Sequence, residues 1–157
     1  MKKEKIQIEY NTFNSIEELS SEHQKLWHFA LEARQFSHSP YSNFTVGAAI
    51  ELENGTIITG TNQENASFPA GLCAERTAMY RAGIQAPDQK FKRIAIAASR
   101  RDAEQLASAP PCGGCRQVML EFEKRHQQGF EILFTNADGK FVLINQPTDL
   151  FPFSFVF

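Results

Sequence analysis

The chain has 157 residues, of which 42% are hydrophobic and 22% are charged, and its formal net charge is −2. This length suits one domain with a substantial core, and the weakly acidic balance lacks the basic excess of proteins that bind nucleic acid phosphates. The N-terminus has no apolar run typical of a signal peptide, and no stretch approaches the roughly 18 apolar residues of a membrane span. We therefore expect a single cytoplasmic domain over residues 1–157, with neither nucleic acid nor a membrane as its partner.

Residues 1–20 form a largely polar N-terminal extension to which no role can be assigned. The alternation Ile6-Gln7-Ile8 fits either an edge strand or a loose tail, and both remain open. Ser15 and Glu18 have the spacing of a capping box, which predicts that a helix begins there. Apolar residues then recur at helical spacing and predict that this helix ends near Phe36. They are Leu19, Leu26, Trp27, Ala30 and Ala33.

Five apolar stretches rich in β-branched residues predict strands beyond this helix. They span residues 44–52, 56–61, 92–99, 130–135 and 140–144. Asn54-Gly55 and Asp138-Gly139 predict tight turns that join the first two and the last two of these strands. With helices between the strands, the order predicts an α/β fold in which helices cover both faces of a mixed sheet.

The three cysteines fall into two groups, each at the predicted start of a helix. Cys73 and Glu75 begin a helix over residues 73–83, closed by Gly83, and Cys112 and Cys115 begin another that runs to about residue 127, closed by a glycine at 129. Cysteines three residues apart face the same way in a first helical turn.

An odd number of reduced thiols suits a metal site better than a disulfide framework. Three thiolates leave one zinc coordination position open, which is typical of catalytic sites, so the sequence predicts one catalytic zinc ion held by Cys73, Cys112 and Cys115. The alternative is a redox pair at Cys112 and Cys115 with Cys73 in the core, but Cys73-Ala74-Glu75 at a second helix start argues against it.

A zinc ion with three thiolates carries a net charge of −1, which opposes the deprotonation of a bound water. Two helix N-termini directed at the sulfur atoms supply partial positive charge. We expect Arg76 to add to this by donating hydrogen bonds to a thiolate. Arg116, directly after Cys115, fits either the same role or a surface ion pair, and both remain open.

These motifs resemble those of the small zinc-dependent cytidine deaminases of the homotetrameric, three-cysteine type. The resemblance covers roughly residues 25–157 and implies a three-layer α/β/α fold with a mixed five-stranded sheet. Cysteine rather than histidine at position 73 favours a free nucleoside as substrate. The motifs are Tyr41-Ser42-Asn43-Phe44, Val46-Gly47-Ala48-Ala49, Asn62-Gln63-Glu64-Asn65-Ala66, Cys73-Ala74-Glu75-Arg76-Thr77-Ala78 and Pro111-Cys112-Gly113-Gly114-Cys115-Arg116-Gln117.

The resemblance implies hydrolytic deamination of cytidine or deoxycytidine to uridine or deoxyuridine, with release of ammonia. Glu75 would be the proton shuttle that serves an activated water, ring atom N3 and the departing amine. Asn62 and Glu64 would bind the ribose, Phe44 would pack against the pyrimidine, and the backbone N–H of Ala74 would hold the base carbonyl.

The resemblance also implies a homotetramer with shared active sites, in which Phe155 reaches into a neighbouring subunit's site. Phenylalanines occupy every second position from 151 to 157, so an extended chain end would line up all four rings on one face. Phe68 departs from the family pattern, because many relatives have tyrosine there, and a hydroxyl contact near the sugar is therefore lost.

Two alternatives compete with this hypothesis. A deaminase of blasticidin-type nucleoside antibiotics shares the zinc chemistry, but Asn62 and Glu64 suit a ribose. A non-catalytic zinc-binding scaffold is the second alternative, and the presence of Glu75 argues against it, because a decayed site has no use for a proton shuttle.

Overall fold

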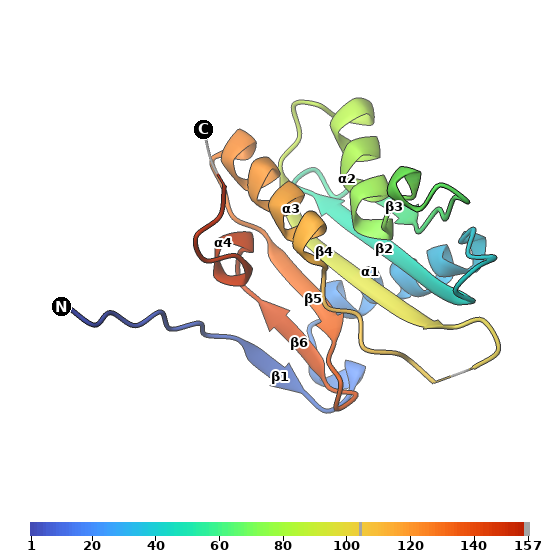
Figure 1. The fold of residues 1–157 in the computed structure, drawn as a ribbon, viewed down its shortest axis with the longest axis horizontal. Coiled ribbons are helices and arrows are strands. Elements are labelled where there is room, and N and C mark those ends of the chain that lie inside the picture. Colours follow the sequence, from blue (N-terminus) through green and yellow to red (C-terminus); the bar gives the residue numbers. More distant parts are fainter. Residues whose placement is uncertain (104, 156–157) are drawn as a thin grey trace.

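The computed structural model describes residues 1–103 and 105–155 as a six-stranded sheet between two layers of helices (Figure 1). The strands are β1 (Asn11–Phe13), β2 (Phe44–Leu52), β3 (Ile57–Thr61), β4 (Phe91–Arg100), β5 (Glu131–Thr135) and β6 (Phe141–Ile144). The helices are α1 (Ser21–Ala33), α2 (Ala74–Gln85), α3 (Gly113–His126) and α4 (Pro147–Leu150), with short 3-10 turns η1 (Ile16–Glu18), η2 (Arg34–Phe36) and η3 (Phe68–Ala70). Within the described residues, no helix has the length and apolar character that crossing a membrane requires.

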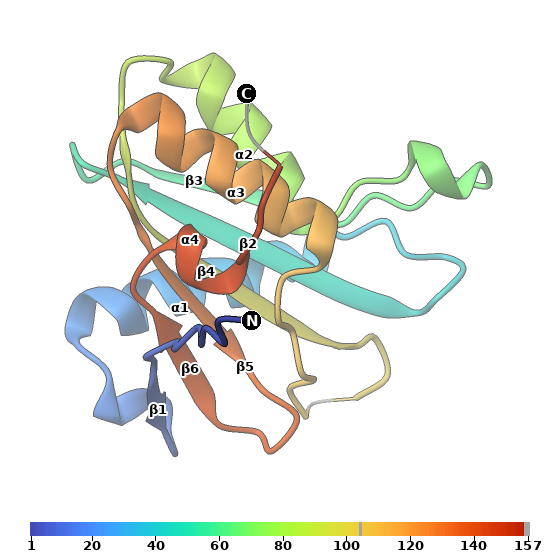
Figure 2. The same cartoon turned by 60° about the vertical axis from the view of Figure 1, so that its left-hand side comes forward.

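The strands follow the order β1-β6-β5-β4-β2-β3, in which β4 and β5 pair in parallel and the other neighbours pair antiparallel. Helix α1 covers one face, and α2 and α3 lie side by side on the other (Figures 1 and 2). The predicted α/β fold with helices on both faces is therefore confirmed. The two predicted hairpins also form, and Gly55 and Gly139 take the positive φ angles of 82° and 76° that their turns require.

The sheet has six strands, so the expectation of five is wrong. The additional strand is β1, which pairs through Asn11, Thr12 and Phe13 with the edge of β6. Only Phe13 is partly buried, and it packs against the core beside α1. Three residues are too few to show an alternating hydrophobic pattern. For that reason the sequence could not decide whether the N-terminal segment forms an edge strand or a loose tail. Residues 1–10, including Ile6 and Ile8, precede β1 and form no strand of their own.

The helix boundaries differ from the prediction at three places. Helix α1 begins at Ser21 rather than at Ser15, because Ser20 accepts the capping hydrogen bond from the backbone N–H of His23. Gly83 lies inside α2, where its missing side chain makes room for the ring of Phe122 from α3. Helix α3 ends when Gln127 adopts a left-handed conformation, so Gly129 is not the residue that closes it.

The described residues of the chain end do not have the extended conformation that would line up the four rings. Residues 147–150 form α4, and the chain then turns at Pro152-Phe153, where Phe153 has a φ of 57°. The turn breaks the alternation that would have placed all the rings on one face. Phe151 is half-buried, Phe155 is exposed, and Phe157 lies outside the described residues.

The central strand β4 is buried on both faces. Ile94, Ile96 and Ala98 contribute to the core under α2 and α3, and Ala95 and Ala97 to the core under α1. Glycines let the helices approach still more closely. A Cβ atom at Gly60 in β3 would lie 2.3 Å from the backbone nitrogen of Ala78 and 2.7 Å from the carbonyl oxygen of Ala74, so the sheet and the backbone of α2 are in direct contact.

The substitution Gly60→Ala should therefore destabilise the protein, because two backbone atoms of α2 cannot yield as a flexible side chain can. Overpacking of this kind costs about 1–3 kcal/mol, which corresponds to a fall in Tm of roughly 2–12 °C for a domain of this size. Gly83→Ala is the matched control. Its Cβ would meet side chains alone, the ring edge of Phe122 at 3.3 Å and the guanidinium of Arg125 at 3.8 Å. Alanine also raises the helix propensity, so the Tm of this variant should stay near that of wild type. Equal Tm values for all three proteins in calorimetry would contradict the close contact.

Candidate metal centre and substrate cavity

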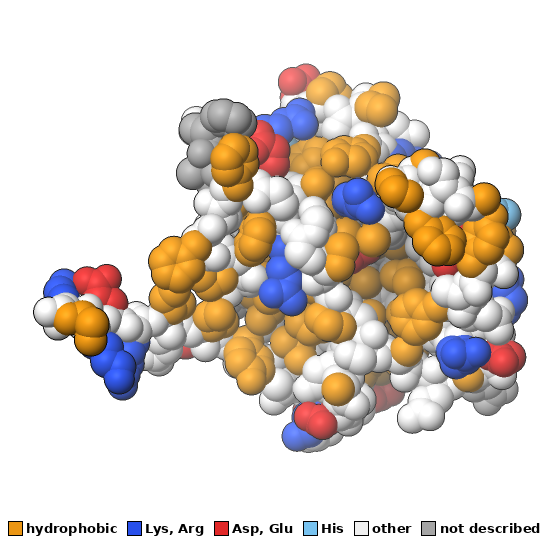
Figure 3. All heavy atoms as spheres, viewed as in Figure 1, with side chains coloured by type: hydrophobic (Ala, Val, Ile, Leu, Met, Phe, Trp, Pro, Cys, Tyr) orange, Lys and Arg blue, Asp and Glu red, His pale blue; other side chains and the backbone are white. Residues whose placement is uncertain are grey.

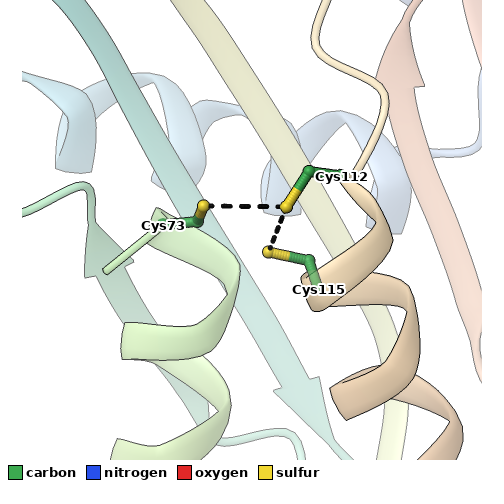
Figure 4. Close-up of side chains that lie close together, drawn as sticks. All are labelled: Cys73, Cys112 and Cys115. Atoms are coloured by element: carbon green, nitrogen blue, oxygen red, sulfur yellow. Dashed lines mark hydrogen bonds between the residues drawn. The ribbon is translucent and has the colours of Figure 1, made fainter. Parts of the chain in front are cut away.

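The sulfur atoms of the three cysteines lie together where α2 and α3 begin (Figure 4). Cys73 is the N-cap residue of α2, Cys112 is the N-cap residue of α3, and Cys115 lies in the first turn of α3. The Cys73 and Cys112 sulfurs are 3.8 Å apart, the Cys112 and Cys115 sulfurs are 3.5 Å apart, and all three lie within 4.8 Å of one another. The two predicted helix starts therefore place all three thiols at one point.

This arrangement fits a zinc ion. Tetrahedral coordination with zinc–sulfur bonds of about 2.3 Å requires sulfur atoms about 3.8 Å apart, close to the observed spacing. Thiolates are preferred zinc ligands, and no histidine or carboxylate belongs to the cluster among the described residues. The site thus supplies three ligands and leaves a fourth position open.

Positive charge surrounds the sulfur cluster. Both helix N-termini point at it, and Nη2 of Arg76 donates to the Cys73 sulfur over 3.8 Å. The pKa of Cys73 is lowered to about 5, first because Cys115 donates a hydrogen bond to it and then, against the opposing effect of burial, because Arg76 and Cys112 do so as well. The contribution of Arg76 is the one that persists when all three sulfur atoms bind a metal ion, and it stabilises the Cys73 thiolate. The location of Arg76 suits the electrostatic role expected of it.

Glu75 lies in the first turn of α2 and is only 5% exposed. Burial raises the pKa of its carboxyl group, because desolvation disfavours the charged form. It lines a cavity of about 450 Å³ together with Cys73 and Cys112. We call this the inner cavity; its lining residues are Ser42, Phe44, Val46, Asn62, Glu64, Cys73, Ala74, Glu75, Ile96, Ser108, Ala109, Pro110 and Cys112. A carboxyl group with a raised pKa beside an open metal position suits proton transfer.

All four residues expected to contact substrate within one subunit line the inner cavity: Phe44, Asn62, Glu64 and Ala74. Phe44 is half-buried at the start of β2. Ala74 is the first residue of α2, and the helix itself does not use its backbone N–H.

Asn62 and Glu64 also shape the cavity. The Asn62 amide accepts from the backbone N–H of Val46 and donates to the carbonyl of Phe44, each over 2.9 Å. Glu64 accepts from the backbone N–H groups of Tyr41 and Ser42 and from the Ser42 hydroxyl, whose hydrogen bond is the main reason that the pKa of Glu64 is lowered. Each side chain keeps further hydrogen-bonding capacity that a sugar hydroxyl can use. Sequence reasoning gave no role to Ser42, although it lies in one of the quoted motifs.

A second cavity of about 520 Å³, the outer cavity, adjoins the inner one through Ser42, Asn62, Glu64 and Cys73. Its wall includes the rings of Tyr41 and Phe68, which meet edge to face at a centroid distance of 5.9 Å. Phe68 is 74% exposed, so the residue that departs from the family pattern lies at the open side of the site. The sequence did not indicate the lining by Ser108 and Ala109, because small side chains there carry no chemical signature.

Arg116 and Phe155, which were both considered for the site, lie outside the inner cavity. Arg116 donates from Nε to the carbonyl of Pro111 and from Nη1 to that of Leu150, and among the described residues it has no hydrogen bond to a thiolate. Phe155 is 66% exposed, and its carbonyl accepts from Gln117, so its ring does not enter the cavity of its own chain.

Comparison with known proteins agrees with this geometry. The family profile of the cytidine and deoxycytidylate deaminase zinc-binding region matches residues 20–128. The chain belongs to this family. The matched range includes Cys73, Glu75, Cys112 and Cys115, and the resemblance drawn from the motifs is confirmed.

Relatives of the deaminase family include the cytidine deaminases of Halalkalibacterium halodurans and Sporosarcina psychrophila. The chain is 41% identical to the former over 92 residues, or 59% of this chain and 65% of the relative. It is 43% identical to the latter over 99 residues, or 63% of this chain and 68% of the relative. The aligned part thus spans just under two thirds of the first relative.

Solved structures of the family extend the likeness. The crystal structure of cytidine deaminase from Burkholderia pseudomallei is 36% identical, with a TM-score of 0.70 over 85% of this chain and 98% of that one. The Mycobacterium tuberculosis cytidine deaminase is 27% identical, with a TM-score of 0.67 over 88% of this chain and 100% of that one. The three-layer fold is therefore that of the family.

Elemental analysis should find close to one zinc ion per chain. Replacing Cys73, Cys112 or Cys115 by Ala should lower both the zinc content and the Tm, because two thiolates bind zinc less tightly and the ion stabilises the folded state. Ser42→Ala is the control, because it changes a cavity residue that has no thiol. Full zinc occupancy in all three cysteine variants would mean that the ligands lie elsewhere.

Proposed function

We propose that this protein is a zinc-dependent hydrolase that deaminates cytidine or deoxycytidine to uridine or deoxyuridine, with release of ammonia. The observation that carries the proposal is a buried carboxyl group, Glu75, beside a three-sulfur metal centre in a cavity of about 450 Å³. The names of the curated relatives support the same activity.

Glu75 moves the protons of this reaction. When bound, the zinc ion supplies the Lewis acid that makes water nucleophilic near neutral pH. The Glu75 carboxylate accepts one proton from the water that attacks ring atom C4 and delivers it to ring atom N3. It then takes the remaining proton from the hydroxyl group added at C4 and passes it to the amine, which leaves as ammonia while the C4 carbonyl forms. A raised carboxyl pKa brings its proton affinity closer to that of these partners.

The rest of the chain orients the nucleoside. The backbone N–H of Ala74 holds the base carbonyl, Phe44 packs against the pyrimidine, and Asn62 and Glu64 bind the ribose. Because Asn62 and Glu64 are already hydrogen-bonded to residues 41–46, they are fixed before substrate enters and little ordering is needed on binding. Arg76 lowers the negative charge of the sulfur cluster.

A role in pyrimidine salvage follows from this substrate class, and a cytoplasmic location is supported by three thiols that must stay reduced to bind zinc.

Several large apolar side chains support assembly into a homotetramer with shared active sites. Figure 3 shows hydrophobic side chains spread over the face that carries α2 and α3. Exposed examples on this and other parts of the surface include Phe36 at 79%, Phe68 at 74%, Ile84 at 82%, Phe153 at 95% and Phe155 at 66%. Apolar surface of this kind marks contact sites between proteins.

The variant Glu75→Gln should lose about 100- to 10,000-fold in turnover, because an amide cannot shuttle a proton. Its zinc content and Tm should stay near those of wild type, since the side chains have the same size. Ammonia release from cytidine, deoxycytidine, cytidine monophosphate and blasticidin measures both the activity and the substrate class. More than a tenth of wild-type turnover in the variant would refute the mechanism.

Phe155→Ala should lower activity if the ring completes the site of a neighbouring subunit, and deletion of residues 154–157 should also shift the protein toward smaller species. Phe153→Ala is the matched control, because it removes an exposed ring two residues away. Light scattering and a cytidine assay on the same samples give both readouts. A wild-type protein that is fully active as a monomer would rule out shared active sites. Wild-type activity in both Phe155→Ala and the shortened protein would show that the chain end is no part of the active site.

A further inference from the structure

Arg116 and Gln117 directly follow the ligand Cys115, and both side chains reach the C-terminal segment, residues 147–155. Nη1 of Arg116 donates to the carbonyl of Leu150 over 3.0 Å, and Nε2 of Gln117 donates to the carbonyl of Phe155 over 2.9 Å. The first turn of α3 therefore holds metal ligands on one side and the C-terminal segment on the other.

The C-terminal segment is also attached further along α3. Glu123, two turns beyond Arg116, accepts from the backbone N–H of Thr148 over 3.0 Å and from its hydroxyl over 3.3 Å. Leu150 packs against the main core. In Figure 2 the segment passes from α4 across α3. Attachment at several points makes it a firm support rather than a loose tail.

Arg116 extends this support to the metal site. Its Nε donates to the carbonyl of Pro111 over 2.8 Å, while Nη1 of the same guanidinium holds Leu150. Pro111 immediately precedes the ligand Cys112. The planar guanidinium therefore connects the backbone just before Cys112 to the backbone of the C-terminal segment.

Cys112 has the greater need for such support. Cys115 is buried within α3, but Cys112 is exposed and precedes the first helical residue. The helix holds Cys112 only through its carbonyl, which accepts from the backbone N–H of Arg116 over 2.9 Å. A ligand that moves easily dissociates from its metal more readily. Residues that hold metal ligands in place typically change metal affinity by about 10- to 100-fold when replaced.

We propose that Arg116 is a positioning residue for the metal centre, through which the C-terminal segment holds Cys112 in its zinc-binding position. The inference rests on the metal centre and not on the identity of the substrate. Lysine keeps the charge of Arg116 but presents a single nitrogen atom, which cannot reproduce the fixed geometry of two guanidinium nitrogens. Arg116→Lys therefore removes the connection between the backbone at Pro111 and the backbone at Leu150, while the positive charge stays.

The experiment measures the rate at which zinc passes from the holoprotein to an excess of a chromogenic zinc chelator at 25 °C. Arg116→Lys should release zinc about 10-fold faster than wild type. Arg125→Lys is the control, because Arg125 lies on the same helix but contacts the ring of Phe122, with its guanidinium carbon 4.8 Å from the ring centroid. Its release rate should equal that of wild type.

A shortened protein ending at Asp149 tests the role of the C-terminal segment. It should also release zinc faster, and Arg116→Lys should have a much smaller effect in it than in the full chain, because Arg116 has lost its anchor. An equal effect of Arg116→Lys in both lengths would overturn the proposal. If circular dichroism shows that the shortened protein does not fold, the zinc-release rates of the full-length wild type, Arg116→Lys and Arg125→Lys proteins decide.

The possible failures are distinguishable. A wild-type protein that holds zinc and an Arg116→Lys variant that releases it at the wild-type rate would overturn only the inference about Arg116. A wild-type protein that holds no zinc would overturn the metal centre itself and this inference with it. Zinc release that changes as expected in a protein inactive on every nucleoside would leave the inference standing and refute the proposed activity.

Discussion

The meeting of two helix N-termini at one point is the constraint on which the rest of the site depends. Cys73 caps α2 and Cys112 caps α3, and three sulfur atoms within 4.8 Å of one another fix how those helices must lie. Like charges at such short distances repel, and the positive ends of both helices together with Arg76 oppose that repulsion. The same arrangement places Glu75 in the first turn of α2, directly beside the cluster and out of contact with bulk water.

The sheet and the helices meet this constraint through small residues. Helix α2 lies directly on β3 because position 60 has no side chain, and α1 is equally close to β2 because a Cβ at Gly47 would lie 2.0 Å from the carbonyl oxygen of Ala30. Where backbones touch, close packing fixes the position of each helix against the sheet, and for α2 the contact lies in its first two turns. The C-terminal segment extends this control to the exposed ligand Cys112 through Arg116. Catalytic geometry at the surface of a small domain thus depends on contacts far from the sulfur atoms.

The two polar side chains that we propose as ribose ligands also hold the walls of the inner cavity in place. Asn62 fixes the backbone of β2 at Phe44 and Val46, and Glu64 fixes the loop at Tyr41 and Ser42. Groups already held in place lose little conformational freedom when a sugar binds, so more of the interaction energy remains for binding. A loss of either side chain should therefore affect both the shape of the cavity and the recognition of substrate.

Much of this protein follows from its sequence, because the signals for Cys73, Glu75, Cys112 and the two hairpins are local. A cysteine at a helix start, a glycine in a tight turn and a run of apolar residues need no distant partner to be recognised. The sequence could not determine β1, which depends on the free edge of β6, nor the turn at Phe153 that breaks the alternation of aromatic rings. It also left the role of Arg116 open, because a guanidinium can reach a thiolate, a carboxylate or a carbonyl equally well. Only the packing of residues 147–155 across α3 decides that Arg116 reaches Leu150, since contacts between segments distant in the chain depend on the folded structure.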